Sequence, residues 1–227
     1  MDSLVSVLIN LSDKDVEELE RSDRQFKALE KLYRCLKGRK ELFFKLVVVN
    51  ALMSYQLQMK GENYWEKFAE FFCVHKDLDN FEEFLRRFNK RFLSAKLKRL
   101  KRAIGCVSQI GLEQVRNAEQ LVEELAKCMG QRKDSKTIVF AVKMMNYAVK
   151  VAEGEELEEL GKIAIPLDSR IRRISKDKAF WGKLSEKTGI PQVKLDAIFW
   201  ICQNEEHLGS LPENLQIKLK RVREKIF

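Results

Sequence analysis

Residues 130–170 read GQRKDSKTIVFAVKMMNYAVKVAEGEELEELGKIAIPLDSR, and this stretch decides how the rest of the chain is interpreted. A glycine and a short polar run open it, and Asp134 or Ser135 can then cap a helix. Apolar side chains follow at helical spacing: Ile138, Val142, Met145 and Val149. The stretch therefore predicts the turn and the second helix of a helical hairpin, with residues 112–129 as the first helix.

Lys136 falls in the first turn of that helix and is a candidate nucleophile. Backbone amides point outward there and the helix dipole is positive, so a cation is disfavoured and the neutral amine is favoured. Asp168 follows Pro166 and suits the cap of a new helix that runs through Ile171 and Ile174. A lysine and a carboxylate facing one cleft could attack and stabilise an electron-poor carbon. The simpler interpretation is that both are solvated residues at ordinary helix starts.

The composition indicates a helical protein with a polyanionic partner. Hydrophobic residues make up 45% and charged residues 34% of 227, with only ten glycines and three prolines, which favours an all-helical fold. The net charge of +9 leaves DNA, RNA and anionic lipid open as partners. No apolar run of about 18 residues and no signal peptide is present, so we expect a cytoplasmic protein without membrane contact.

Five cysteines are scattered along the chain: Cys35, Cys73, Cys106, Cys128 and Cys202. No CxxC pair exists, and with only two histidines the sequence supports no zinc site. We therefore expect reduced, mostly buried thiols, no metal and no cofactor.

The densest positive charge lies in residues 86–102. Apolar side chains within it predict an amphipathic helix whose basic residues lie outside: Phe92, Leu93, Leu97 and Leu100. Both a solvated helix and a phosphate-contacting face fit this pattern. A further helix, over residues 41–59, is so apolar that we expect it to be central and buried.

Six ordered segments, which extend over residues 21–203, resemble a known family. They are Arg21-Ser-Asp-Arg-Gln25-Phe26, Asn50-Ala-Leu-Met-Ser54-Tyr55, Gly61-Glu62-Asn-Tyr-Trp65, Ser135-Lys136-Thr-Ile-Val-Phe140, Ile165-Pro-Leu-Asp168 and Leu195-Asp196-Ala-Ile-Phe-Trp200. Together they resemble the helix-hairpin-helix DNA glycosylase superfamily, and within it the archaeal 8-oxoguanine DNA glycosylases (AGOG). The hairpin departs from the superfamily's commonest pattern, because Gly130 stands alone where two glycines contact phosphate. Arg132 and Lys133 could replace that contact by charge.

The resemblance implies an all-helical, two-lobed fold with the active site in the cleft between the lobes. One lobe would contain residues 31–164 and end with the hairpin; the other would contain residues 1–30 and 165–227. Some superfamily members carry an iron–sulfur cluster on four C-terminal cysteines. Only Cys202 lies in that region here, so we expect no cluster.

The resemblance also implies a bifunctional repair enzyme that excises 8-oxoguanine. Lys136 would attack C1′ of the damaged nucleotide, and Asp168 would stabilise positive charge on the sugar. The base would leave behind a lysine Schiff base, and β-elimination would then cleave the apurinic site.

The base pocket follows from the same resemblance, which assigns to it Gln25, Ser54, Trp65, Phe140, Lys143, Asp196 and Trp200. Phe140 lies one helical turn beyond Lys136, so its ring could stack on a base held near the amine. Asp196 and Trp200 are also four residues apart and share a helix face. One supplies a carboxylate for ring N–H groups and the other an indole for stacking.

Beyond Asp168, the residues Arg170, Arg172 and Arg173 crowd one helical turn and could hold the phosphate next to the target nucleotide. The expected partner is DNA that contains oxidised guanine, bound by a monomer. Two alternatives stay open. One is a non-catalytic basic helical module that binds DNA or RNA through residues 86–102, and the other is a glycosylase of the same superfamily for another base lesion.

Overall fold

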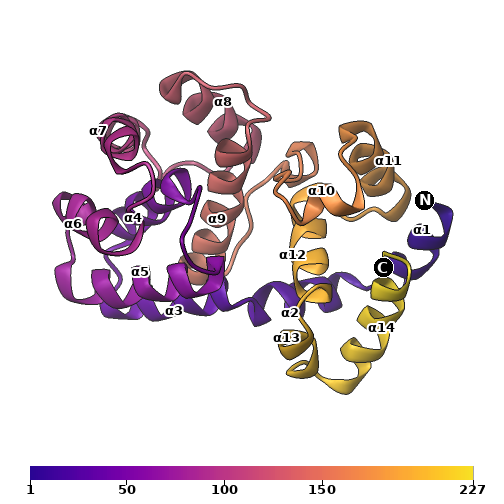
Figure 1. The fold of residues 1–227 in the computed structure, drawn as a ribbon. Coiled ribbons are helices and arrows are strands. Elements are labelled where there is room, and N and C mark those ends of the chain that lie inside the picture. Colours follow the sequence, from indigo (N-terminus) through magenta and orange to yellow (C-terminus); the bar gives the residue numbers. More distant parts are fainter. Residues whose placement is uncertain (227) are drawn as a thin grey trace. The chain divides into compact units, whose positions relative to one another are not determined.

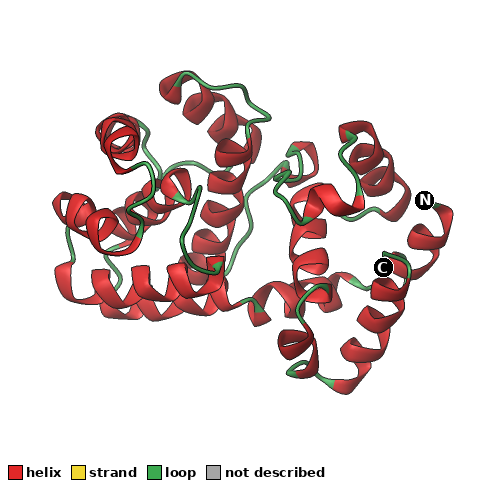
Figure 2. Cartoon of the chain, viewed as in Figure 1, coloured by secondary structure: helices red, strands yellow, loops and turns green. Residues whose placement is uncertain are grey.

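The computed structural model describes residues 1–226, and helices form nearly all of its regular structure (Figures 1 and 2). Fourteen α-helices and two short 3-10 helices occur in that range, and no strand does. The nearest approach to a sheet there is an isolated bridge between Asn117 and Glu158. The expected all-helical class is confirmed.

The chain divides into two compact units. Unit 1 combines the N-terminal segment Met1–Asp23 with Leu160–Phe227, and unit 2 is the continuous segment Arg24–Glu159. Each unit has its own buried apolar core, and each is described by itself below.

Unit 2 holds the helical hairpin. Its helices are α3 (Arg24–Cys35), α4 (Lys40–Met53), α5 (Gly61–His75), the 3-10 helix η1 (Leu78–Asn80), α6 (Phe81–Phe88), α7 (Leu93–Gln109), α8 (Ala118–Met129) and α9 (Lys136–Glu153). The hairpin is α8–α9. Within the unit α4 packs most extensively against α9, while α3 and α5 lie side by side (Figure 1).

α4 is the central helix of this unit, because apolar residues occur on all of its faces and other helices cover them. From Phe43 to Met53 only Lys45 is not fully buried. The predicted burial is therefore confirmed, but the predicted end at residue 59 is wrong. The helix stops at Met53, and the Ser54 hydroxyl donates to the Asn50 carbonyl at 2.7 Å. That bond satisfies one of the carbonyls that a helix end leaves without a backbone partner.

Unit 1 is assembled from both ends of the sequence. Its helices are α1 (Asp2–Leu8), α2 (Asp13–Ser22), the 3-10 helix η2 (Leu160–Lys162), α10 (Ile171–Ile174), α11 (Lys178–Thr188), α12 (Gln192–Cys202), α13 (Glu205–Gly209) and α14 (Glu213–Glu224). α12 is buried along most of its length and packs against α2 and α14. A capping box between Ser12 and Asp15 begins α2, and Lys218 of α14 donates to the same aspartate at 2.6 Å.

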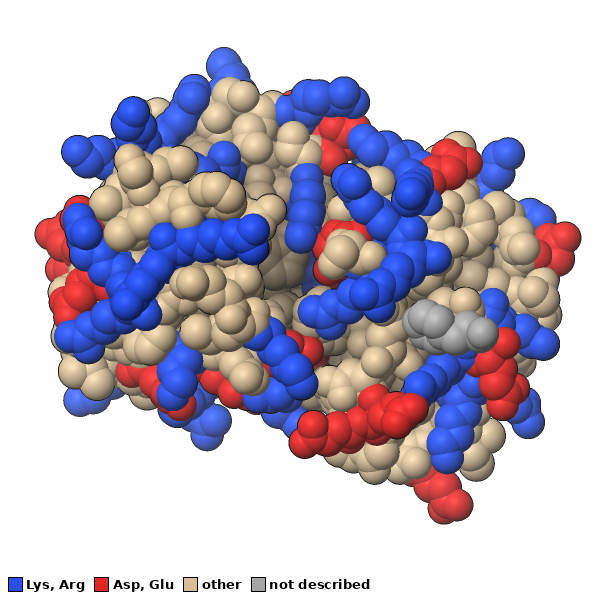
Figure 3. All heavy atoms as spheres, viewed as in Figure 1, with Lys and Arg blue, Asp and Glu red and all other residues tan. Residues whose placement is uncertain are grey.

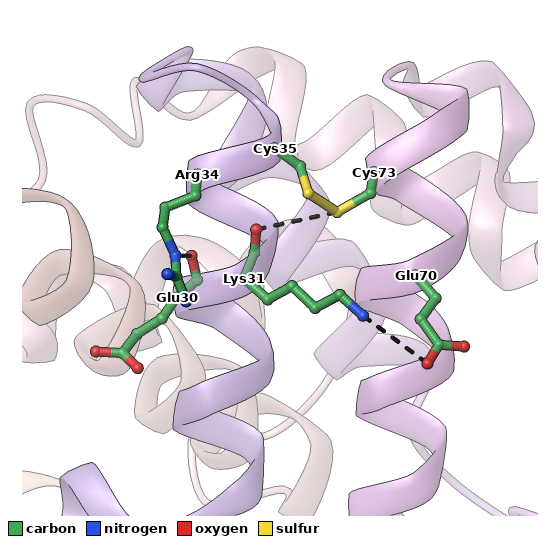
Figure 4. Close-up of a disulfide and its surroundings, with 6 residues drawn as sticks. All are labelled: Glu30, Lys31, Arg34, Cys35, Glu70 and Cys73. Carbon is green, nitrogen blue, oxygen red and sulfur yellow. Dashed lines mark hydrogen bonds and ion pairs between the residues drawn. A yellow bond between two sulfur atoms is a disulfide. The ribbon is translucent and has the colours of Figure 1, made fainter.

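The expectation of reduced thiols is wrong for four of the five cysteines. Cys35 of α3 is bonded to Cys73 of α5, and Cys106 of α7 is bonded to Cys128 of α8. Figure 4 shows the first bridge, beside an ion pair of 3.9 Å between Lys31 and Glu70 that joins the same two helices. Helix packing brings these Cα atoms to 5.1 and 5.7 Å, and the sequence separations of 38 and 22 give no sign of it.

Cys202 matches the expectation for a free, buried thiol. Burial in α12 raises its pKa to about 12, which keeps the thiol protonated. Among the described residues, no helix is both long enough and apolar enough to cross a membrane.

Candidate active site

The α8–α9 hairpin sets where the candidate lysine lies. Asn117 caps α8 through its side chain, and Gly130 ends it in the left-handed conformation with φ of +62°. The amide of Gln131 then reaches back to the Ala126 carbonyl at 2.9 Å. After this turn α9 begins at Lys136, whose side chain is exposed to solvent.

One face of α9 carries four residues of interest at helical spacing: Lys136, Phe140, Lys143 and Tyr147. Lys136 is exposed, Phe140 is half-buried, and Lys143 and Tyr147 are buried. The ammonium of Lys143 lies 5.3 Å from the centre of the Tyr147 ring. The face therefore runs from a solvent-exposed amine at the helix start, past an aromatic ring, to a cation in the interior.

Aromatic side chains from other helices of unit 2 pack against this face of α9. Trp65 of α5 meets Phe140 edge-on, with ring centres 6.1 Å apart. Phe26 of α3 meets Tyr147 in the same way at 5.3 Å. The neighbouring Gln25 is only 4% exposed. Gln25, which the family resemblance assigns to the base pocket, is thus buried in the helix that packs on α9.

Asp168 lies in unit 1, in the segment just before α10. Its Oδ1 accepts from the backbone amides of Arg170 and Ile171 at 2.8 and 2.9 Å. Two amide donors on one oxygen fix the orientation of the carboxylate and satisfy the first turn of the helix. Asp168 is half-buried, so part of the residue remains accessible to solvent, as expected of a group that meets a substrate.

Asp196 and Trp200 lie on α12, also in unit 1. Asp196 is 5% exposed, while Trp200 is half-buried. The guanidinium carbon of Arg170 lies over the Trp200 ring, 2.9 Å from its centre. The indole face predicted to stack on a base is thus covered by an arginine predicted to hold phosphate.

The other predicted DNA-binding cations have protein partners. Arg132 donates to both carboxylate oxygens of Asp134 at 3.0 Å, and Lys133 pairs with Glu123 of α8. Arg172 is exposed and donates through Nε to the Leu167 carbonyl at 3.1 Å. These surface pairs are weak, so a phosphate can replace the carboxylate at little cost.

The expected arrangement of residues 86–102, with every basic residue outside and Phe92 on the apolar face, is wrong for two basic residues of α7 and for Phe92. Lys96 is fully buried, Arg99 is half-buried, and Phe92 is 59% exposed. The buried face runs through Lys96, Leu100, Ala103 and Val107, so the lysine occupies an apolar position of this helix. The remaining basic side chains of α7 are exposed, and Lys and Arg atoms project from the surface where this helix lies (Figure 3).

Arg99 is a further residue of this region, and the sequence pattern did not indicate it. Its Nη2 donates to the side-chain oxygens of Gln131 and Thr137 at 2.7 and 3.0 Å, and its Nε donates to the Leu52 carbonyl at 3.1 Å. A long basic run gives no sign of which member makes such contacts. Within residues 1–226 no cluster of three or more His, Cys, Asp or Glu residues could hold a metal ion.

Comparison with known proteins connects this geometry to a family. A family model described as AGOG, N-glycosylase/DNA lyase, matches residues 5–226. The chain belongs to the AGOG family. The family resemblance seen in the six sequence segments is therefore confirmed, and so is an enzyme that acts on DNA as glycosylase and lyase.

Individual AGOG relatives cover nearly the whole chain. An N-glycosylase/DNA lyase of Nanoarchaeum equitans is 39% identical, over 88% of this chain and 89% of its own. The corresponding protein of Thermococcus kodakarensis is 35% identical, over 91% of this chain and 82% of its own. The alternative of a non-catalytic binding module does not fit these relatives.

A solved AGOG structure has the same fold. It is a crystal structure of Pa-AGOG, the 8-oxoguanine DNA glycosylase of Pyrobaculum aerophilum, complexed with 8-oxoguanosine. The TM-score is 0.81 at 26% identity, with 97% of this chain and 95% of that one covered. The hairpin α8–α9 and the flanking helices thus form a known glycosylase fold.

Proposed function

We propose that this AGOG-family protein removes 8-oxoguanine from DNA with Lys136 as the nucleophile, and then cleaves the strand at the same nucleotide. The observation that carries the proposal is the face of α9, where an exposed lysine at the helix start leads to a half-buried aromatic ring and a buried cation. The similarity to an 8-oxoguanine glycosylase bound to the nucleoside supports the choice of base.

The first chemical step exchanges one bond at C1′ for another. The neutral Lys136 amine attacks C1′, the bond to N9 of the base breaks, and its electron pair leaves with the base, which takes up a proton. A flipped nucleotide is required, because C1′ of a stacked nucleotide is not accessible to a side chain.

The later steps cleave the strand. The nitrogen lone pair opens the sugar ring, which leaves a protonated imine at C1′ and a hydroxyl at C4′. This imine acidifies the C2′ protons, so that removal of one expels the 3′ phosphate by β-elimination. Water then hydrolyses the imine and restores Lys136. None of these steps calls for an oxidant or a reductant.

We assign to Asp168 the stabilisation of positive charge on the sugar while the base departs. Its carboxylate is suited to this role because two backbone amides hold it in one orientation. The base itself would be recognised by Gln25, Ser54, Trp65, Phe140, Lys143, Asp196 and Trp200.

Each of these residues offers a contact that an oxidised purine needs. The aromatic rings stack on the base, and the amide, hydroxyl and carboxylate groups meet its edge. When a base stacks on the Trp200 ring, it must either displace Arg170 from that ring or stack on the ring face opposite to Arg170. Arg132, Lys133 and Arg172 would hold phosphates, and the protein would act as a monomer on DNA.

The test is the variant Lys136→Gln on a duplex with a single 8-oxoguanine. We expect loss of base release, of strand cleavage and of borohydride trapping, because all three need the amine. Lys127→Gln is the matched control, since Lys127 is another exposed lysine of the same hairpin and should leave all three unchanged. Trapping that persists in Lys136→Gln would remove this lysine from the mechanism.

A second set of duplexes tests the choice of base. Wild-type protein is incubated with single oxidised pyrimidines, alkylated purines or undamaged guanine in the same sequence context. We expect efficient release of 8-oxoguanine alone. A clear preference for one of the other lesions would keep the enzyme class and overturn the substrate.

A further inference from the structure

Arg99 joins three separate segments of unit 2 with one guanidinium group. It reaches the last turn of α4 through the Leu52 carbonyl at 3.1 Å and the hairpin turn through Gln131 at 2.7 Å. It also reaches the first turn of α9 through Thr137 at 3.0 Å. The last contact is adjacent in sequence to the proposed nucleophile Lys136.

Two of the partners of Arg99 are also hydrogen-bonded to each other. The Thr137 hydroxyl donates to the same Gln131 oxygen that accepts from Arg99, at 3.2 Å. The guanidinium carbon lies 5.7 Å from the centre of the Tyr55 ring, in the loop that follows Ser54. A planar group with several donors can meet acceptors in different directions at once, which a lysine ammonium cannot do with the same geometry.

The residues that precede Arg99 at the start of α7 include two buried polar side chains, those of Asn89 and Lys96. Lys96 lies one helical turn earlier on α7 and is fully buried. Its ammonium lies 5.0 Å from the centre of the Tyr55 ring, the same ring that Arg99 contacts. Lys96 donates to the side chain of Asn89, and Asn89 in turn donates to the Met53 carbonyl at 3.0 Å. Arg99 and the residues around the start of α7 are therefore joined to the end of α4 by hydrogen bonds to the Leu52 and Met53 carbonyls.

We infer that Arg99 is a positioning residue for the lysine reaction: it fixes the hairpin turn and the first turn of α9 against the end of α4, so that Lys136 is held at the attack distance. This inference rests on the proposed function, because it takes Lys136 as the nucleophile. Arg99 itself contacts no reacting atom in this assignment. The segments it joins carry Ser54 at one end and Lys136 at the other.

The expected consequence is a loss of rate without a matching loss of binding. A reacting group that is misplaced by about 1 Å can slow a reaction about 100-fold, whereas many phosphate contacts share the binding of DNA. A purely structural residue would instead lower folding stability, and binding and rate would fall together.

The experiment compares Arg99→Met and Arg99→Lys with wild type on an 8-oxoguanine duplex. The single-turnover rate of base release is measured together with DNA affinity, the latter in a Lys136→Gln background so that no turnover occurs. We expect Arg99→Met to slow base release about 10- to 100-fold, with affinity changed less than about threefold. Arg99→Lys should lie between, because an ammonium can meet only part of the acceptor set.

Two further measurements keep the result decisive. Millimolar guanidinium should restore part of the rate to Arg99→Ala, because it can occupy the vacated position at concentrations far below those that unfold proteins. Thr137→Val removes one acceptor while it keeps the side-chain shape, and should slow base release about 3- to 10-fold. If Arg99→Met does not fold, Thr137→Val and Arg99→Lys decide the question.

Arg34→Met is the control, since Arg34 is an exposed arginine of α3 and, among residues 1–226, its side chain bonds only within its own helix, at the Glu30 carbonyl. Equal rates for wild type and the Arg99 variants would overturn the inference and leave the proposed function standing. Rates that fall only in step with melting temperature, without guanidinium rescue, would also overturn it. Wild-type protein inactive on 8-oxoguanine DNA would instead reject the proposed function.

Discussion

At Asp168 a single substitution can separate the effect of the negative charge from the effect of the side-chain shape. Asp168→Asn keeps an oxygen that can accept from the amides of Arg170 and Ile171, so α10 should remain capped. The substitution removes the negative charge. We expect single-turnover base release to fall about 100-fold or more, with DNA affinity nearly unchanged.

The comparison for Asp168→Asn is Asp177→Asn in the same unit. Asp177 caps α11 by accepting from the Ala179 amide at 2.9 Å, and no catalytic role is assigned to it. It should show wild-type base release. Full activity of Asp168→Asn would mean that the aspartate serves only as a helix cap.

Lys96 is a second residue whose charge has a measurable effect. Burial lowers its pKa to about 8, and the nearby charge of Arg91 adds to this. Below pH 8 the amine is charged in both the folded and the unfolded state, so the cost of burying the charge is constant. Between pH 8 and the ordinary value of 10.5 the folded state loses its proton first, so folding stability rises with pH.

The variant Lys96→Met tests this effect. We expect the unfolding free energy of wild type, relative to Lys96→Met, to rise by up to about 3 kcal/mol between pH 7.5 and 10.5. Urea unfolding at several pH values measures it. A constant difference across that range would show that the amine is solvated and titrates normally.

At the scale of elements, the junction before α7 carries backbone strain. Phe92 precedes the helix with φ of +56°, in the left-handed region that side chains with a Cβ atom avoid. Its ring is 59% exposed, so burial of the side chain contributes little to holding it there. Asn89 and Lys96 lie before and after Phe92 in the sequence, and the buried hydrogen bond between them constrains the chain to turn at Phe92.

Comparing Phe92→Gly with Phe92→Ala isolates that strain. Both variants lose the ring and its contact with Arg91, but only glycine tolerates the backbone conformation. We expect Phe92→Gly to be more stable than Phe92→Ala by about 1 kcal/mol in chemical unfolding. Equal stabilities would indicate that the backbone relaxes to an ordinary conformation when the phenylalanine is replaced.

At the scale of the whole molecule, both disulfides lie in unit 2 and none of the described disulfides lies in unit 1. Each closes a loop within the unit, of 38 and 22 residues. The chain-entropy estimate for loops of this size is about 3 to 4 kcal/mol each, as an upper value. Intracellular disulfides of this structural kind are a feature of proteins from hyperthermophiles.

Calorimetry with and without reductant checks this asymmetry between the units. Reduction should lower the melting temperature of unit 2, and the paired variant Cys35→Ser with Cys73→Ser should reproduce part of the loss without reductant. Cys202→Ser does not affect either bridge and serves as the reference for loss of a thiol. A melting curve that reductant leaves unchanged would indicate that the cysteines are not bonded in solution.

The sequence by itself determined the features that depend on neighbours three or four residues away. The helical class, the start of α9 at Lys136 and the alignment of Lys136, Phe140 and Lys143 follow from local periodicity and capping. The cap of α10 by Asp168 is local in the same way. Ordered motifs then indicated the family, because their combination is far more specific than any one of them.

Only the tertiary structure decided the features that join distant parts of the chain. The two cysteine pairs, the burial of Lys96 and the contacts of Arg99 depend on which helices pack together. A basic residue on an amphipathic helix has the same local pattern whether it faces water or an acceptor on another helix. The difference is made by the desolvation and hydrogen bonding that packing imposes, and these are set by residues far away in sequence.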